Sequence, residues 1–324
     1  MHPRAILAIV VLLFYTPLLL LSSLLTHRHG LRQSWNGPWF ALPTFALTRL
    51  LWAALTLAAL SSSPPPTGPL AAAATFAIDG LSPLLFAALG LVRRLRSLVA
   101  AKRIREGRVE EARGMAVTAR RLNVVDLALT AAFVCASVAY RGLSADEVVE
   151  GPQRHSGVAR AAAGLFVGAF AAIAAAAGVA VGGWWWRGDV DGGEGKVVVA
   201  LVGALPLLCV RLVYLCLDVL GGLGAFSAVT GSATAFLCMA LLEEAVVAAW
   251  FVAVGFKVRV VPREETLAMR EAEKRAEEVG KDGGDAALLE RGGGKLADEE
   301  DGRVELDARE RGPELDGRMR AEMP

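Results

Sequence analysis

Seven apolar blocks dominate this sequence, and a chain that carries them has few folds open to it. A helical span needs about 20 mostly apolar residues to cross about 30 Å of hydrocarbon. The blocks cover Ala5–Thr26, Trp39–Leu60, Leu70–Val92, Val124–Tyr140, Val158–Trp186, Val197–Leu220 and Ser232–Phe256. With 54% hydrophobic residues and a mean hydropathy of +0.46 over 324 residues, the chain is too apolar for a soluble domain. We therefore predict an all-α integral membrane bundle of seven transmembrane helices.

The distribution of Lys and Arg sets the predicted orientation. With seven spans, the side that receives the N-terminus carries four of these residues, and the opposite side carries eighteen up to Arg270. Loops rich in Lys and Arg stay in the cytoplasm. We therefore expect the N-terminus outside or in a lumen and the C-terminus in the cytoplasm, in a plasma membrane or an endomembrane.

Composition divides the chain into three parts. Residues 1–258 form the predicted seven-helix membrane domain. Residues 259–280 are charged, with Glu and Arg or Lys at helical spacing, which predicts a short cytoplasmic helix. Residues 281–324 are rich in Gly, Asp, Glu and Arg and have no aromatic residue, which predicts a disordered tail.

The segment from Arg93 to Asn123 is the only long internal loop that the pattern predicts. It holds ten basic and three acidic residues. Its basic part, 93–121, would lie on anionic lipid headgroups of the bilayer, or it would dock a cytoplasmic protein. Because basic residues gather beside apolar spans, we expect no nucleic-acid partner. The stretch Gly188–Lys196 is predicted to be a flexible turn.

Five ionisable residues fall near the middle of the spans, where each charge costs about 2.5–3.5 kcal/mol on insertion scales. They are Arg49, Asp79, Arg211, Glu243 and Glu244. Two are basic and three are acidic, so mutual pairing is the expected way to neutralise them. Adjacent helical residues point about 100° apart. Glu243 and Glu244 therefore cannot both face one partner.

The sixth block adds two polar residues to this set. Arg211, Tyr214 and Asp218 have the spacing i, i+3 and i+7, which puts them on one helix face. That face should contact protein or water and not lipid. Two interpretations remain open: a structural lattice of ion pairs that fixes helix order, or a polar cavity that binds a solute, a proton or a ligand.

A weak internal sequence similarity between the second and sixth blocks bears on the interpretation as a polar cavity. The second block reads "ALPTFALTRLLW" around Arg49, and the sixth reads "ALPLLCVRLVY" around Arg211. An ancestral three-helix unit used twice would produce this pattern, with the polar site at the repeat interface.

Several kinds of site have no signal in this sequence. All four histidines fall in terminal or loop positions, and the four cysteines lie inside apolar blocks without metal-ligand spacing. There is no glycine-rich phosphate loop and no nucleophile elbow. We therefore expect no enzyme, no metal site and no cofactor.

Three stretches resemble a known family. "DGLSPLL" in the third block, "RLVYLCLD" in the sixth and "LLEEAVV" in the seventh are similar to a fungal seven-helix membrane family, catalogued as a domain of unknown function, number seven-seven-zero-two. The resemblance covers Ile6 to Val258. It implies seven helices and an acidic residue on the seventh, which Glu243 or Glu244 would supply, and it implies no activity or ligand.

Three functions are compatible with these features. A receptor or sensor is favoured by the orientation, the long basic segment and the charged tail. A small-solute or proton-coupled transporter would use the set of charged residues at the midplane. A structural scaffold would use the same set only to hold its helices together.

Overall fold

The computed structural model describes residues 3–30, 37–61, 67–139, 157–190, 192–221, 224–227, 231–262, 264–269 and 271. The chain divides into two units, Met1–Ala272 and Glu273–Pro324, and the described residues all lie in the first. The predicted tail, 281–324, lies outside the described residues. Of the predicted charged helix, 259–280, residues 264–269 are helical and most of the rest lies outside the described part.

The described residues form helices and no strand. The long helices are α1 (Pro3–Arg28), α3 (Pro38–Leu60), α4 (Thr67–Asp79), α5 (Leu81–Arg105), α6 (Val109–Ala139), α8 (Gly157–Val179), α9 (Gly195–Val219) and α11 (Leu242–Lys257). Shorter elements are the π-helical turns η2 (Ala180–Trp185) and η4 (Leu237–Leu241), the 3-10 turn η3 (Gly224–Phe226) and α10 (Ala233–Phe236).

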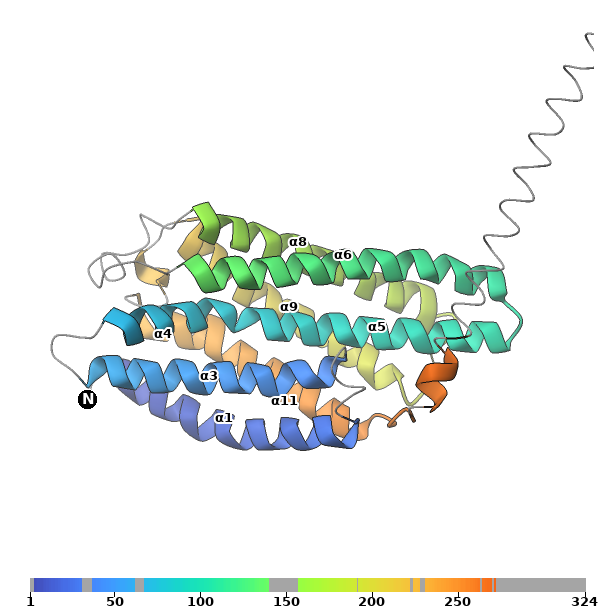
Figure 1. Cartoon of the computed structure of the whole chain (residues 1–324), viewed down its shortest axis with the longest axis horizontal. Helices are drawn as coiled ribbons and strands as arrows, with labels where there is room; N and C mark the ends of the chain where they lie inside the picture. The colour runs from blue at the N-terminus through green and yellow to red at the C-terminus, as the bar shows by residue number, and fades with distance from the viewer. Residues whose placement is uncertain are drawn as a thin grey trace, which may run out of the picture. The chain divides into compact units, whose positions relative to one another are not determined.

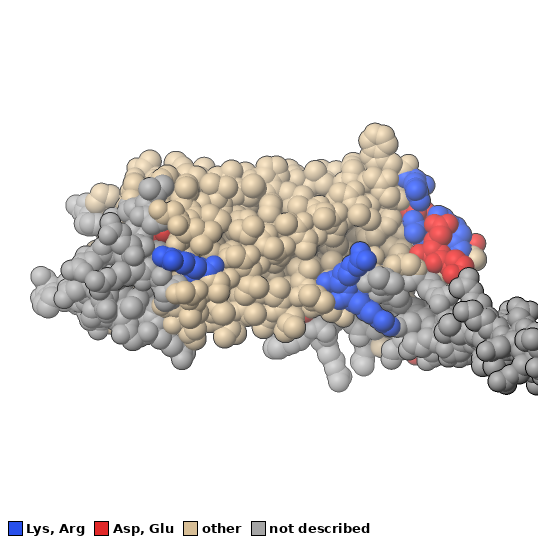
Figure 2. Space-filling view, turned by 90° about the horizontal axis from the view of Figure 1, so that it is seen from above, with Lys and Arg blue, Asp and Glu red and all other residues tan. Residues whose placement is uncertain are grey.

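Within the described residues, seven helical stretches are long and apolar enough to cross a membrane. The third stretch joins α4 to α5, the fifth joins α8 to η2, and the seventh runs from α10 to α11. Large apolar side chains face outward from the bundle; Leu13, Leu20 and Leu127 are each at least 67% exposed. Figure 2 shows a broad surface without charge between charged residues near the ends. These features are those of a multi-pass membrane protein, as predicted.

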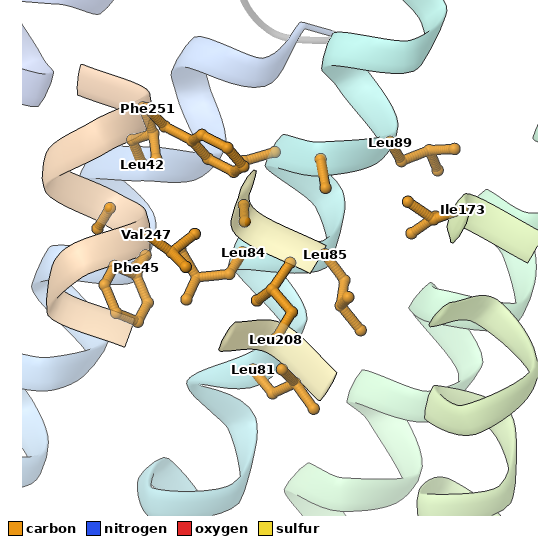
Figure 3. Packing of buried hydrophobic residues seen from close by; sticks show 14 of the residues in the cluster. Leu42, Phe45, Leu81, Leu84, Leu85, Leu89, Ile173, Leu208, Val247 and Phe251 are labelled. Atoms are coloured by element: carbon orange, nitrogen blue, oxygen red, sulfur yellow. The ribbon is translucent and has the colours of Figure 1, made fainter. Parts of the chain in front are cut away.

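The helices form a sequential ring around α5. In this ring α1 packs on α3, α4 joins α3 to α6, and the sequence continues through α8 and α9 to α11, which packs back on α1. In addition, α5 contacts α3, α6, α8, α9 and α11, and the span that contains it is 83% buried over its most apolar part (Figure 1). Leucines on α5 fill the centre of the bundle (Figure 3) between side chains of four other helices: Leu42, Phe45, Ile173, Leu208, Val247 and Phe251.

The third span differs from the single helix predicted over Leu70–Val92. It is interrupted at Gly80, between α4 and α5. The cause is Pro83, which has no N–H to donate to the carbonyl of Asp79 and whose ring crowds that carbonyl. The Ser82 hydroxyl donates a hydrogen bond of 2.8 Å to the same carbonyl instead. Such interruptions are tolerated at membrane depth where protein surrounds them.

The predicted internal loop from Arg93 to Asn123 is wrong, because these residues are mostly helical. Helix α5 continues to Arg105 and α6 already begins at Val109, so a tight turn with Gly107 at φ +77° joins them. The fourth span is therefore part of a helix much longer than Val124–Tyr140. The charges that suggested a loop belong to a helical hairpin that extends beyond the neighbouring helix ends (Figure 1).

The described residues of Gly188–Lys196 form the predicted turn and the start of α9, and two acids of this stretch anchor the hairpin. Asp189 accepts hydrogen bonds from Arg103 on α5 and from Arg108 Nη1 in the turn, the latter at 2.9 Å. Glu194 pairs with Arg94 at 2.8 Å. Although burial alone would raise the pKa of Asp189, the hydrogen bonds from the two arginines hold it below its ordinary value. The end of the bundle is therefore fastened by ion pairs.

Candidate functional site

Three charged side chains meet at the centre of the bundle. Oε1 of Glu244, on α11, accepts hydrogen bonds from Arg49 Nη2 on α3 at 2.6 Å and from Arg211 Nε on α9 at 2.5 Å. The side chains of Arg49 and Glu244 are 0% exposed, and that of Arg211 is 2% exposed. We call Arg49, Arg211 and Glu244 the central cluster. It joins the second, sixth and seventh spans through one carboxylate oxygen.

The interrupted third span completes this cluster. Arg49 Nη1 donates to the carbonyl of Phe76 at 3.2 Å, and Arg211 Nη2 donates to the carbonyl of Ala77 at 2.8 Å. Both carbonyls lie in the last turn of α4, directly before the break at Gly80. The interruption at Gly80 therefore supplies acceptors for two guanidinium groups in an apolar environment.

Gly80 is required at the interruption because of the close approach of Arg49. A Cβ atom at position 80 would overlap the guanidinium group of Arg49. The ring of Phe45 covers the same guanidinium, with 5.8 Å from its carbon to the ring centroid. The position of Arg49 is thus fixed by an ion pair, a backbone carbonyl, an aromatic face and the missing side chain of Gly80.

The structure assigns different places to the adjacent acids of the seventh span. Glu244 faces the core together with Val247, Ala248 and Phe251, whereas Glu243 is partly exposed and makes no ion pair among the described residues. Asp79 is also buried, but its Oδ2 accepts a hydrogen bond from the Ser137 hydroxyl at 2.9 Å. Within the described residues Asp79 forms no ion pair, so the expected pairing of midplane acids with bases holds for Glu244 and is wrong for Asp79 and Glu243.

The polar face predicted on the sixth span is buried. Arg211, Tyr214 and Asp218 are each no more than 2% exposed, and the guanidinium of Arg211 lies 5.7 Å from the Tyr214 ring centroid. The Tyr214 ring contacts Phe226 and Phe236. This face of the sixth span therefore contacts protein and not lipid.

Sequence reasoning missed Tyr15 on α1. It is 1% exposed and its ring packs edge-on against Phe45, with 5.5 Å between the centroids. A tyrosine in a long apolar block gives no signal of this kind, because the same residue often lies at membrane interfaces. Its place beside the ring that covers Arg49 connects the first span to the central cluster.

Hydrogen bonding in this region is incomplete. Six buried polar atoms have no hydrogen-bond partner among the described residues: the hydroxyls of Tyr15 and Tyr214, Arg49 Nε, Asp79 Oδ1, Glu243 Oε2 and Glu244 Oε2. An unsatisfied buried polar group costs about 1–3 kcal/mol. Three cavities in the described part of the chain have volumes of about 330–580 Å³, and none of these three is lined by a member of the central cluster. The cluster is buried but not fully satisfied.

The comparison with protein families gives one result. The family model described as domain of unknown function DUF7702 matches residues 1–261, which include every helix named above. The chain belongs to that family. The resemblance expected from the third, sixth and seventh blocks is thereby confirmed. Among curated proteins and among solved structures, none matches the chain.

Proposed function

We propose that this chain is a seven-helix membrane sensor and that the central cluster is its switch. The observation that carries the proposal is one carboxylate oxygen of Glu244 shared by Arg49 and Arg211, inside a buried and incompletely satisfied core. The desolvation of buried charges offsets most of their attraction, so such clusters add little net stability. Their best-attested role is to specify one arrangement of helices against another.

Backbone irregularities beside each member of the cluster support a switch. Each arginine follows a proline within its helix, Pro43 before Arg49 in α3 and Pro206 before Arg211 in α9, and the π-helical turn η4 precedes Glu244. Proline and π-turns are the usual causes of kinks in helices. Together with the third span, which is broken at Gly80, these three spans can change direction next to the charges that hold them together.

The proposed orientation places the signal output in the cytoplasm. The hairpin of α5 and α6 carries ten of the 21 Lys and Arg residues in 1–258, and this asymmetry favours a cytoplasmic position for it and for the C-terminus. A sequential ring with a central third helix is also compatible with a receptor, although that argument is an analogy of architecture. In this proposal the hairpin transmits changes at the central cluster to a cytoplasmic protein partner.

The test compares Glu244→Gln with Glu243→Gln, because the two residues are adjacent and only Glu244 holds arginines. Spin labels at Glu106 and Lys257, in a background without the four native cysteines, report the distance between the hairpin and the end of α11 in nanodiscs. We expect a second distance population for Glu244→Gln and the wild-type distribution for Glu243→Gln. If the Glu244→Gln protein folds and keeps the wild-type distance distribution, the central cluster has only a structural role and the sensor proposal is rejected.

A small-solute transporter is the second candidate, favoured by one observation. An interrupted helix at the depth of buried charges is typical of substrate sites in secondary transporters, and the third span is interrupted beside Arg49 and Arg211. Proteoliposomes assayed for uptake of small anions and cations would test this candidate. Flux that Glu244→Gln abolishes and Glu243→Gln retains would favour the transporter over the sensor.

A further inference from the structure

A cleft on the side of the bundle lies between α3 and α6, with α5 as its floor. Its volume is about 330 Å³, and its lining includes Phe40, Thr44, Ser82, Phe86, Thr130 and Phe133. Helices α3 and α6 both pack on α5, which lies between them in Figure 1. Thr44, Thr130 and Phe133 are exposed on the edges of the cleft. Because all three helices are candidate spans, the cleft opens toward the lipid.

The cleft has the depth of one leaflet. Ser82 lies at its inner end, two residues after Gly80, and Arg93 lies at its outer end. Eleven helical residues at 1.5 Å each separate the two, which gives about 16 Å. Half of a hydrocarbon core of about 30 Å is about 15 Å. The cleft therefore reaches from the level of the headgroups to the middle of the membrane.

Polarity along the cleft changes sharply from its inner part to its mouth. The hydroxyls of Thr44, Ser82 and Thr130 all donate to carbonyls of their own helices or the preceding turn, so the inner walls offer no spare donor from these groups. At the mouth, Arg93 Nη2 contacts the carbonyl of Leu122 at 3.1 Å and Asp126 at 3.4 Å.

Arg93 has unused capacity for an anion. Its Nε and Nη1 have no partner in the described part of the chain, and its ion pair with Asp126 is long and partly exposed, with side-chain exposures of 25% and 42%. An arginine presents five N–H donors in a fork that suits phosphate. The cleft thus combines an apolar channel of one-leaflet length with a guanidinium at headgroup level.

We propose that this cleft binds an anionic phospholipid of the surrounding leaflet, with one acyl chain along Phe40, Phe86 and Phe133 and the phosphate at Arg93. The volume is that of a small ligand pocket and suits a single chain. The second chain stays in the bilayer. The lipid is held by its headgroup, so it differs from lipids that merely cover the outer surface.

The inner end of the cleft connects this site to the central cluster. Ser82 and Pro83 line the cleft, and Ser82 donates to the carbonyl of Asp79, directly before the glycine that touches Arg49. The tip of a bound chain therefore contacts the interruption of the third span. If the proposed sensor function holds, the anionic lipid is a ligand of the sensor. That role rests on the proposed function, whereas the binding of lipid in the cleft does not.

Photo-crosslinking of the full chain in nanodiscs tests the binding. The probes are phosphatidylglycerol and phosphatidylcholine that carry the same diazirine in one acyl chain, and labelled peptides are mapped by mass spectrometry. We expect phosphatidylglycerol to label cleft peptides of α3, α5 and α6 about fivefold more than phosphatidylcholine, the effect of one arginine near an anionic headgroup. Arg93→Gln should bring the two probes to equal labelling.

Two further variants separate the cleft from the general lipid surface. Ala41→Trp, inside the cleft, should reduce labelling of the cleft peptides by both probes, whereas Leu47→Trp, on the exposed face of α3, should leave it unchanged. Equal labelling by the two probes in the wild type, or no effect of Ala41→Trp, would overturn the proposal. Crosslinking reads occupancy and not helix movement, so its failure is distinguishable from failure of the sensor.

Discussion

Replacement of Glu244 by Gln tests the electrostatic basis of the central cluster. The amide has the shape of the carboxylate and keeps an oxygen that can accept from Arg49 and Arg211, but it removes the negative charge. Two guanidinium groups would then lie in an apolar core with backbone carbonyls as their other acceptors. In this variant the two guanidinium charges have no carboxylate partner and no solvent, so the free energy of unfolding must fall.

The structure sets the size of this loss. The three side chains are 0–2% exposed, so solvent does not screen their interaction. Removal of one partner from a buried ion pair costs about 3–5 kcal/mol. Because Gln retains both hydrogen bonds, we expect the lower end, about 3 kcal/mol. The triple variant Arg49→Met, Arg211→Met, Glu244→Leu removes all three charges and leaves two carbonyls without side-chain donors, for a loss of about 2 kcal/mol.

Unfolding in mixed micelles by titration with sodium dodecyl sulfate, followed by tryptophan fluorescence, measures these differences. Glu243→Gln is the matched control and should stay within about 0.5 kcal/mol of the wild type, because Glu243 makes no ion pair among the described residues. If Glu244→Gln were as stable as Glu243→Gln, the charge of Glu244 would not stabilise the arginines. If the triple variant were less stable than Glu244→Gln, the cluster would contribute net stability, contrary to the reasoning above.

Three other perturbations have defined outcomes. Gly80→Ala should lower the free energy of unfolding by about 1–3 kcal/mol, because the new Cβ displaces the guanidinium of Arg49. Asp189→Asn should lower the free energy of unfolding by about 2 kcal/mol and speed hydrogen exchange of the hairpin. Because the pKa of the Asp189 carboxyl is lowered in the folded protein, this stabilisation exists above pH about 4 and disappears as pH falls. Burial lowers the pKa of His29, which bonds to the Gly255 carbonyl, so thermal stability should fall as pH drops below about 6.5 and His29→Gln should weaken that dependence.

Each of these outcomes has a control. Gly68→Ala, where a Cβ meets no atom within 4 Å, should be neutral, and an equal loss at Gly68 and Gly80 would attribute the effect to backbone freedom. A difference between the wild type and Asp189→Asn that persists at pH 3 would contradict an ionic role for Asp189. An unchanged pH profile in His29→Gln would assign the acid sensitivity to another group.

The class of fold was accessible from the sequence because lipid imposes a strict length on apolar helices. Seven blocks of sufficient length predicted seven spans, and the cost of charge at the midplane singled out Arg49, Arg211 and the Glu243–Glu244 pair. The choice between the two glutamates was not accessible. The pair is flanked by apolar residues on both sides, so no periodic polar face distinguishes the core from the lipid, and only the positions of α3 and α9 decide.

The hairpin was missed because charge was read as a sign of a loop. A helix that leaves the membrane can continue in water when its charged residues find partners, as Arg103 and Arg108 do with Asp189. Those partners come from a segment more than eighty residues away along the chain, and neither segment alone predicts the other. The break in the third span was equally hidden, since the arginines that bond to the carbonyls of Phe76 and Ala77 beside it come from other spans.

Helix α5 runs without a break from Leu81 to Arg105 and can act as a lever arm. One end, the pivot, is the interruption at Gly80 beside the central cluster, and the other end is the hairpin turn. Twenty-five residues at 1.5 Å make an arm of about 37 Å. A tilt of about 10° at the pivot would displace the hairpin turn by about 6 Å, so a rearrangement of a few side chains at mid-depth would be enlarged to the size of a helical turn at the far end.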